Sequence, residues 1–224
     1  MNSRLRSYAV LAVMPLFFVS NLIIGRPAVE TVPPWTLATL RWGLACLILA
    51  PFALPPVRAH ARALIAARGR ILLLGFLGMW ICGGIVYLAL LYTTATHGTL
   101  IYTASPAIVV LIQALIARRP LPLAQTLGVL LAVGGVFVIV LEGNPLAILG
   151  HKFNIGDLMF VVCAIAWAFY SLLLKDATLQ SIPTLTLFFM IALAGTVISR
   201  SRRNRCAISP MPISSKLLRV LMST

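Results

Sequence analysis

The chain has 224 residues, of which 61% are hydrophobic and only 10% are charged, and its mean hydropathy is +1.03. An ordinary soluble domain carries roughly 25% charged residues, so this composition excludes a soluble globular protein, a disordered chain and a disulfide-stapled secreted module. A membrane-spanning helix needs about 20 mostly apolar residues, so this length holds roughly seven to eight spans and no sizeable soluble domain.

The net charge of +14 comes from 18 basic residues against four acidic ones. The basic residues fall between apolar runs, which is typical of loops that face an anionic membrane leaflet. We therefore expect a lipid bilayer, and no nucleic acid, as the partner of these charges. The four cysteines form no CxxC pair and lie at no metal-ligand spacing from a histidine, so the sequence predicts neither a metal site nor a cofactor.

Seven apolar runs of spanning length follow one another along the chain, at residues 8–24, 35–54, 71–92, 98–117, 121–141, 157–174 and 184–199. The runs are continuous rather than alternating, which favours α-helices over the strands of a closed barrel. The first run ends at Gly25-Arg26-Pro27 and not at a small-residue cleavage site, so we expect it to be kept as a spanning helix.

Prolines mark the connections between these runs. The pair Pro33-Pro34 separates the first two, and Pro55-Pro56 is expected to end the second because proline cannot continue the helical hydrogen-bond ladder. Residues 119–122 separate the fourth run from the fifth, and Glu142 and Pro145 bound the start of the longest connection.

The distribution of basic residues predicts the orientation of the chain in the membrane. With the N-terminus in the cytoplasm, the outside segments before the last run carry only Arg26 and Lys152. The inside segments then carry Arg4, Arg6, Arg58, Arg62, Arg68, Arg70, Arg118 and Arg119. Positive charge concentrates on the cytoplasmic side of short loops, so we expect a multi-pass protein with a cytoplasmic N-terminus.

An internal repeat is indicated by a constant offset, which relates Arg26 to Lys175, Pro34 to Pro183, and Leu44-Ala45 to Leu193-Ala194. We expect a first five-helix repeat at residues 1–145 and the start of a second at 156–198. Because five is odd, the second copy is inverted in the membrane. The predicted fold class is an all-α polytopic membrane protein, an inverted five-helix repeat whose second copy is incomplete, with about seven transmembrane helices.

Residues 199–224 form a basic tail that is not expected to enter the membrane. It carries six of the 18 basic residues, although seven spans would place it outside. Either the seventh run does not span, or the tail follows a frameshift or truncation, or it is a regulatory tail. We favour the second interpretation because composition changes abruptly within the repeat, and we then expect no transport by this chain alone.

Four stretches carry a resemblance to a known family: residues 34–41 with Pro34 and Arg41, residues 87–93 with Tyr87, Pro106 in residues 102–106, and Gly128 with Gly134-Gly135. In this order they resemble the EamA-type transporters of the drug/metabolite transporter superfamily, over about residues 8–198. The resemblance implies a ten-helix carrier built of two five-helix repeats, which exports amino acids, metabolites or toxic compounds. The chain departs from the family at Arg118-Arg119, where an acidic residue is usual, and in lacking the last three helices.

Polar and aromatic side chains inside the spans are the candidates for a substrate cavity: Asn21, Arg41, Tyr87, Tyr102, Ser105, Gln113, Trp167 and Tyr170. Arg41 either faces such a cavity or reaches the membrane interface beside two tryptophans. Pro106 frees a backbone carbonyl one turn earlier, and the span's polar residues either line the cavity or bond to other helices. Glycines of the third and fifth spans are expected to pack helices. Asp157 at a membrane edge and His97 in a loop are not expected to carry protons.

The sequence thus predicts a bacterial inner-membrane protein, a transporter that exports a small metabolite or drug by alternating access. Two alternatives stay open: a non-functional truncated remnant of such a carrier, and a structural membrane subunit that forms a homodimer through small-residue faces. No acid pair, nucleophile with its base, or metal cluster supports an enzyme.

Overall fold

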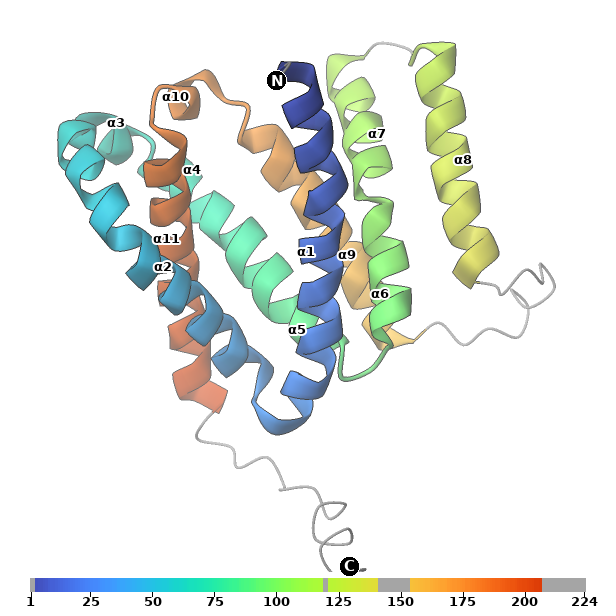
Figure 1. Ribbon diagram of the computed structural model, residues 1–224, viewed down its shortest axis with the longest axis horizontal. Coiled ribbons are helices and arrows are strands. Elements are labelled where there is room, and N and C mark those ends of the chain that lie inside the picture. Colours follow the sequence, from blue (N-terminus) through green and yellow to red (C-terminus); the bar gives the residue numbers. More distant parts are fainter. Residues whose placement is uncertain (1–2, 119–120, 141–153, 207–224) are drawn as a thin grey trace, which may run out of the picture.

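The computed structural model of the chain describes residues 3–118, 121–140 and 154–206, and in these ranges it is helical with no strand. The helices lie side by side in one bundle (Figure 1). In chain order they are α1 (Ser3–Thr31), α2 (Pro34–Ala59), α3 (Ala61–Ala66), α4 (Arg68–Leu74), the π-helix η1 (Gly75–Ile85), α5 (Val86–Ala89), α6 (Ala95–Thr103), α7 (Ser105–Ala117), α8 (Leu123–Val140), α9 (Ile155–Leu173), α10 (Ala177–Gln180) and α11 (Thr184–Cys206).

Four helical stretches are long and apolar enough to cross a membrane: Pro34–Ala59, Arg68–Ala89, Ala95–Ile116 and Ile155–Leu173. They correspond to the second, third, fourth and sixth predicted runs. The fifth and seventh runs form the shorter apolar helices Leu123–Gly135 and Thr184–Arg200. The first run lies in α1, and many of its side chains are outside the described residues. The prediction of an all-helical membrane protein is therefore confirmed, while the five-helix repeat stays a prediction.

The connections between the long helices alternate between the two ends of the bundle (Figure 1). One end holds α3, α10, the end of α7 and the start of α8, and we call it the α3 end. The other holds the α1–α2 turn and the starts of α6 and α9, and we call it the α6 end. Arg58, Arg62 and Arg70 belong to the α3 end, whereas Arg26 lies near the α1–α2 turn. This separation follows the predicted charge pattern, and the orientation relative to the cell stays a prediction.

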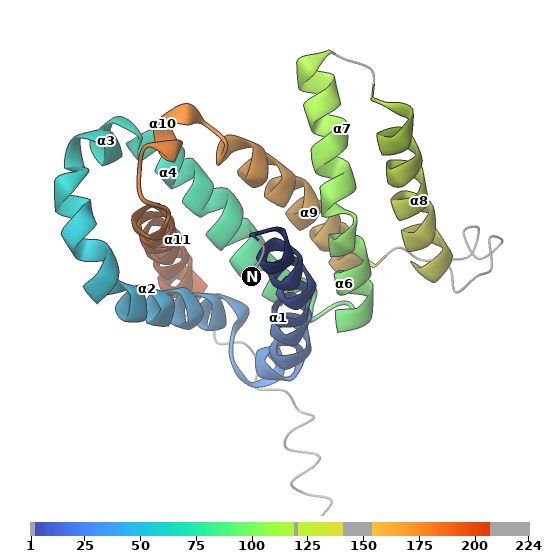
Figure 2. The same cartoon turned by 45° about the horizontal axis from the view of Figure 1, so that its top comes forward.

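Helix α2 contradicts the expectation that Pro55-Pro56 ends the second span, because it continues to Ala59 with Pro51, Pro55 and Pro56 inside it. Each proline removes one backbone donor and clashes with the preceding turn, which bends a helix instead of ending it when packing holds both halves. The bend is visible where α2 turns towards α3 (Figure 2). The half of α2 before the bend contains Arg41, and the half after it leads to the α3 end.

The third span is unusual, because its central eleven residues form the π-helix η1. Glycines of this segment lie against large side chains: a Cβ on Gly78 would lie 2.7 Å from Cε2 of Tyr170, and one on Gly83 would lie 2.5 Å from Nε1 of Trp42. The prediction that these glycines pack helices is confirmed. At Gly128 of α8 a Cβ would meet no described atom within 4 Å, so the packing expected there stays a prediction.

The fourth span is divided at Ala104 into α6 and α7. Pro106 has no N–H to donate to the carbonyl of Tyr102, and the hydroxyl of Ser105 donates to that carbonyl instead. The freed carbonyl predicted from Pro106 is thus present and has a partner. At its far end α7 stops at Arg118, which adopts the left-handed conformation with φ 49°.

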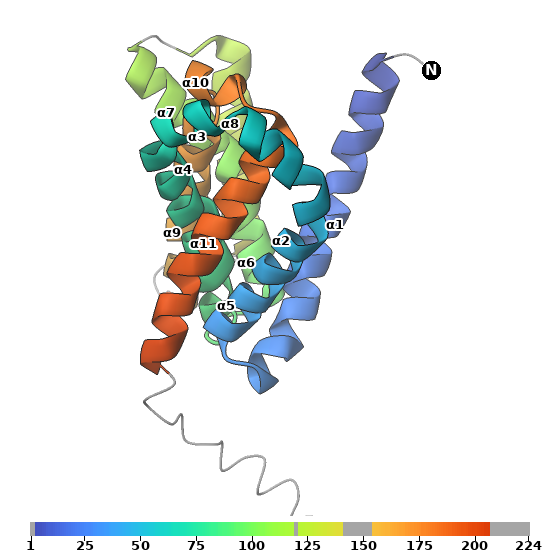
Figure 3. The same ribbon diagram turned by 90° about the vertical axis from the view of Figure 1, so that its left-hand side faces the viewer.

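The centre of the bundle is formed by α9 and the continuous stretch from α4 to α5, which pack on one another. Helix α11 packs along α2 and runs in the opposite direction (Figure 3). It continues as a helix through Arg200 to Cys206 at the α6 end, beyond the run of residues 184–199. The remaining tail, like residues 141–153 with Glu142 and Lys152, lies outside the described residues.

Candidate substrate site

Three of the predicted residues meet at one point inside the bundle: Asn21 of α1, Arg41 of α2 and Tyr87 of α5. Nη1 of Arg41 donates to Oδ1 of Asn21 at 2.6 Å and to the Tyr87 hydroxyl at 2.9 Å. The Tyr87 hydroxyl in turn donates to the same Oδ1 of Asn21 at 2.8 Å. The guanidinium is therefore turned towards neighbouring helices, and both of its hydrogen bonds are to neutral partners.

The local sequence explains why these three side chains reach one another. Gly25 lies one turn after Asn21, and a Cβ there would be only 2.9 Å from Cε1 of Tyr87. The absence of a side chain at Gly25 lets the tyrosine ring lie against α1. Tyr87 is buried, with 3% of its surface exposed, and it lies in α5, two residues after the end of η1.

Aromatic rings surround the charge of Arg41. Its Cζ lies 4.3 Å from the ring centroid of Trp42 and 5.4 Å from that of Tyr87, distances at which a cation is attracted by the ring face. The Nε1 atom of Trp42 is buried without a hydrogen-bond partner in the described part of the chain. The rings attract the cation and do not neutralise it.

A cavity of about 310 Å³ opens beside this cluster, and we call it the Arg41 cavity. Asn21, Arg41 and Tyr87 supply its polar atoms, and its other walls are apolar or small: Ile24, Gly25, Ala28, Leu37, Leu40 and Leu44. Ligand sites in proteins are mostly apolar with a few placed polar groups, and this cavity has that character. A second cavity of about 200 Å³ between α1 and α6 has no charged lining residue.

Another three of the predicted residues gather elsewhere, between α6 and α9. Trp167 stacks on Tyr170 with ring centroids 5.1 Å apart, and Tyr102 lies 6.4 Å from Trp167. Tyr102 and Tyr170 are buried, while Trp167 is 38% exposed. This group packs α9 against α6 and η1, and none of its residues lines the Arg41 cavity.

The last two predicted residues, Ser105 and Gln113, also lie away from the Arg41 cavity. Ser105 is buried at the start of α7, where its hydroxyl bonds to the Tyr102 carbonyl. Gln113 is half-buried farther along α7 and makes no side-chain hydrogen bond with the described residues. Of the eight predicted residues, the structure thus brings Asn21, Arg41 and Tyr87 together at one cavity.

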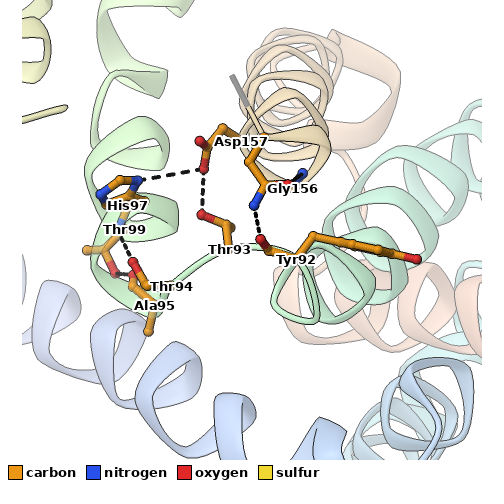
Figure 4. A network of polar contacts seen from close by, with 9 residues as sticks. Tyr92, Thr93, Thr94, Ala95, His97, Thr99, Gly156 and Asp157 are labelled. Atoms are coloured by element: carbon orange, nitrogen blue, oxygen red, sulfur yellow. Dashed lines mark hydrogen bonds and ion pairs between the residues drawn. The ribbon is translucent and has the colours of Figure 1, made fainter. Parts of the chain in front are cut away.

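Sequence reasoning missed a second polar cluster at the α6 end, shown in Figure 4. Asp157, only 7% exposed, accepts a hydrogen bond from the Thr93 hydroxyl at 2.6 Å, and Nδ1 of His97 lies 3.9 Å from the same carboxylate oxygen. The sequence does contain a signal for its burial: Asp157, Phe160 and Ala164 follow one another at helical spacing and therefore share the buried face of α9. In the described residues no group of His, Cys, Asp and Glu has a metal-binding arrangement.

The comparisons with known proteins agree on one family. A model of the EamA-like transporter family matches residues 5–141. The chain is 24% identical to the uncharacterized transporter YyaM of Bacillus subtilis (strain 168), over 93% of this chain and 70% of that protein. It is 28% identical to an uncharacterized transporter of Archaeoglobus fulgidus, over 77% of this chain and 58% of that protein. It is 29% identical to a WAT1-related protein of Arabidopsis thaliana, over 70% of this chain and 47% of that protein. No solved structure matches.

Proposed function

The chain belongs to the EamA-like transporter family, and we propose that the protein exports a small molecule across a bacterial inner membrane by alternating access. In this mechanism two halves of the protein rock around a site near the middle of the membrane, which opens to each side in turn. The chain covers about half to 70% of the length of the three relatives described above, so the activity of the whole protein is part of the proposal.

One observation carries the proposal: Arg41, which belongs to a helix long and apolar enough to span a membrane, lines a cavity. A charged side chain at the centre of a spanning helix costs about 2.5–3.5 kcal/mol on insertion scales, so it is retained where it serves a pathway or a site. The hydrogen bonds from Asn21 and Tyr87 hold it in that position.

The relation between α2 and α11 supports the inverted-repeat part of the mechanism. These helices carry the paired segments Leu44-Ala45 and Leu193-Ala194, and they run in opposite directions along one another. The contact is built from small and aromatic residues, including Ala53, Phe189 and Ala192. Packed helices of opposite direction are expected from two inverted copies that meet along a common line.

Association with a second copy of the chain belongs to the same proposal. Helix α8 packs mainly on α6 and α7 among the described elements, and a Cβ at Gly128, Gly134 or Gly135 would meet no described atom within 4 Å. Small residues let helices of two chains approach closely in a membrane. A homodimer through this face would complete the wall around the transport path.

Uptake by inverted membrane vesicles tests the proposed function. Vesicles from cells that express the chain are incubated with a metabolite extract of the same cells, and accumulated compounds are identified by mass spectrometry. If a homodimer completes the wall of the path, at least one compound should accumulate above the empty-vector level, whereas the expectation of no transport by a single chain predicts none. This accumulation should be lost with Arg41→Ala and kept with Arg58→Ala, which changes an exposed arginine at the α3 end, at equal amounts in the membrane.

No accumulation by the wild-type chain would overturn the proposal in favour of a non-functional remnant. Accumulation that Arg41→Ala leaves unchanged would show that the path does not pass through the Arg41 cavity.

A further inference from the structure

The Arg41 cavity contains a positive charge that nothing in the described part of the chain balances. The described ion pairs join Arg70 to Asp176 and His97 to Asp157, and Arg41 takes part in neither. Its hydrogen-bond partners, Asn21 and Tyr87, are neutral. The lining of the cavity therefore carries one net positive charge and no acidic side chain.

The guanidinium keeps donors available for a ligand. Among the described residues only Nη1 of Arg41 is hydrogen-bonded, so Nε and Nη2 remain without a partner. The planar arrangement of these nitrogens matches the two oxygens of a carboxylate, which arginine binds through parallel hydrogen bonds. The bonds from Nη1 to Asn21 and Tyr87 fix the plane of the group in advance, so less conformational freedom is lost when a ligand binds.

The remaining walls of the cavity define the rest of the ligand. Ile24, Leu37, Leu40 and Leu44 form an apolar surface, and the small residues Gly25 and Ala28 leave space beside α1. A volume of about 310 Å³ admits a small organic molecule. A ligand with one anionic group and an apolar body of this size would pair with the guanidinium of Arg41 and pack against the apolar walls.

We propose that the Arg41 cavity binds a monocarboxylate with an apolar body, the carboxylate pairing with Nε and Nη2 of Arg41. The inference rests on the proposed function, because it names the substrate class of the same site. A single negative charge neutralises the single positive charge, so the loaded cavity is neutral. Since a net charge is costly to hold in the low dielectric of a membrane, a monoanion fits better than a dianion or a cation.

Matched pairs of ligands test the charge directly. The purified full-length chain in a neutral detergent is titrated with 4-methylpentanoate and with 4-methylpentanamide, and tryptophan fluorescence is recorded because Trp42 lies beside Arg41. The amide has the same shape without the charge. Hydrogen bonds to charged groups contribute enough that we expect the acid to bind about ten-fold to a hundred-fold more tightly than the amide. Equal affinities, or no saturable signal with the acid, would overturn the inference.

Variants then assign the effect to Arg41. Arg41→Gln should abolish the preference for the acid, and Arg41→Lys should keep part of it, because lysine retains the charge and loses the planar donors. Arg70→Gln, which changes an exposed arginine at the α3 end, should bind like the wild type. If Arg41→Gln does not elute as a folded protein, the Arg41→Lys comparison decides: an unchanged acid affinity there would contradict the bidentate pairing.

Lipid competition is the second arm of the test, because the phosphate of an anionic lipid is also a monoanion. The titration is repeated in micelles with phosphatidylglycerol and in micelles with phosphatidylcholine. Acid binding that is unaffected by phosphatidylglycerol supports a soluble carboxylate as the ligand. Binding abolished by low amounts of phosphatidylglycerol would show that the cavity holds a lipid headgroup and would overturn the inference.

These measurements are independent of the transport assay. Carboxylate binding without uptake in vesicles would leave the inference intact and contradict the proposed function. Uptake of a cationic or neutral compound, with no preference for the acid, would support the proposed function and contradict the inference.

Discussion

The Thr93 hydroxyl donates a 2.6 Å hydrogen bond to the carboxylate of Asp157, which joins the turn before α6 to the first turn of α9 (Figure 4). Both residues are buried, and they come from the two segments predicted to belong to different repeats. Gly156 permits the approach, since a Cβ there would lie 2.8 Å from the carbonyl oxygen of Ala89. A polar contact of this kind ties the two halves of the bundle together at the α6 end.

Removal of the Thr93 hydroxyl should therefore destabilise the bundle. Thr93→Val keeps the size of the side chain and leaves the buried carboxylate of Asp157 without its closest donor, at a cost of about 1–3 kcal/mol. The measurement is thermal unfolding of the full chain in detergent. The control is Thr103→Val, because the exposed Thr103 hydroxyl bonds only to the carbonyl of Thr99 in its own helix. Similar stabilities for the two variants would contradict the importance of the contact.

Substitution of Gly25 should separate Tyr87 from Arg41. In Gly25→Ala the new methyl group would lie 2.9 Å from the Tyr87 ring, so the ring must move, and overpacking of this kind costs about 1–3 kcal/mol. We expect weaker binding of 4-methylpentanoate together with lower stability. Gly43→Ala is the matched control on α2, where the methyl group meets no described atom within 4 Å and alanine should stabilise the helix by about 1 kcal/mol. Unchanged binding in Gly25→Ala would mean that Tyr87 does not position Arg41.

The carboxylate of Asp176 gives the bundle a defined response to acid. The hydroxyl and the backbone N–H of Thr178, with Arg70 at 3.1 Å, hold the pKa of this carboxyl below its ordinary value of 3.8. Because the folded pKa is the lower one, this contribution to stability is present above pH 3.8 and is lost as the pH falls through the folded value. Asp176→Asn should remove that part of the acid sensitivity, measured as unfolding temperature between pH 5 and about pH 2. Glu30→Gln, at an exposed position on α1, should keep the wild-type profile, and a loss of the same size there would refute the assignment.

The orientation predicted from the basic residues is tested with fused reporters. A reporter after Arg62 in α3 should be active as a cytoplasmic protein, because α3 lies at the arginine-rich end of the bundle. A reporter after Asn144 should be active as a periplasmic protein, since it follows the fifth predicted span. Alkaline phosphatase and green fluorescent protein fused at both points measure this, and the reversed pair of activities would invert the topology.

The positions of most helices follow from the sequence because apolar runs and prolines are local signals. The connection at Pro33-Pro34 and the end of α7 before Pro120 lie where the residues predict them. The continuation of α2 through Pro55-Pro56 was not predicted, because it depends on packing against α11, which has no local signature. The same holds for η1, since its glycines indicate close packing and not an i→i+5 hydrogen-bond pattern.

The candidate site shows the same division between local and distant information. Arg41 was recognised from its cost in an apolar run, but its two possible positions were equally compatible with the sequence. Its partners Asn21 and Tyr87 lie 20 and 46 positions away along the chain, so their meeting depends on how three helices pack. The burial of Asp157 could not be predicted from its place at the edge of an apolar run, because the start of α9 is covered by the turn before α6, which is distant in the sequence.

The π-helix η1 also determines in which direction around the helix axis the later side chains of the third span point. Hydrogen bonds from i to i+5 widen the turn, so each residue of η1 advances by a smaller angle than the 100° of an α-helix. If η1 were rewound with α-helical bonds, Tyr87 would swing around the helix axis relative to α4. Tyr87 lies two residues after the end of this segment, so we expect its hydroxyl to reach Arg41 only while the wide turns are kept. The winding of eleven residues therefore decides whether the arginine has its tyrosine partner.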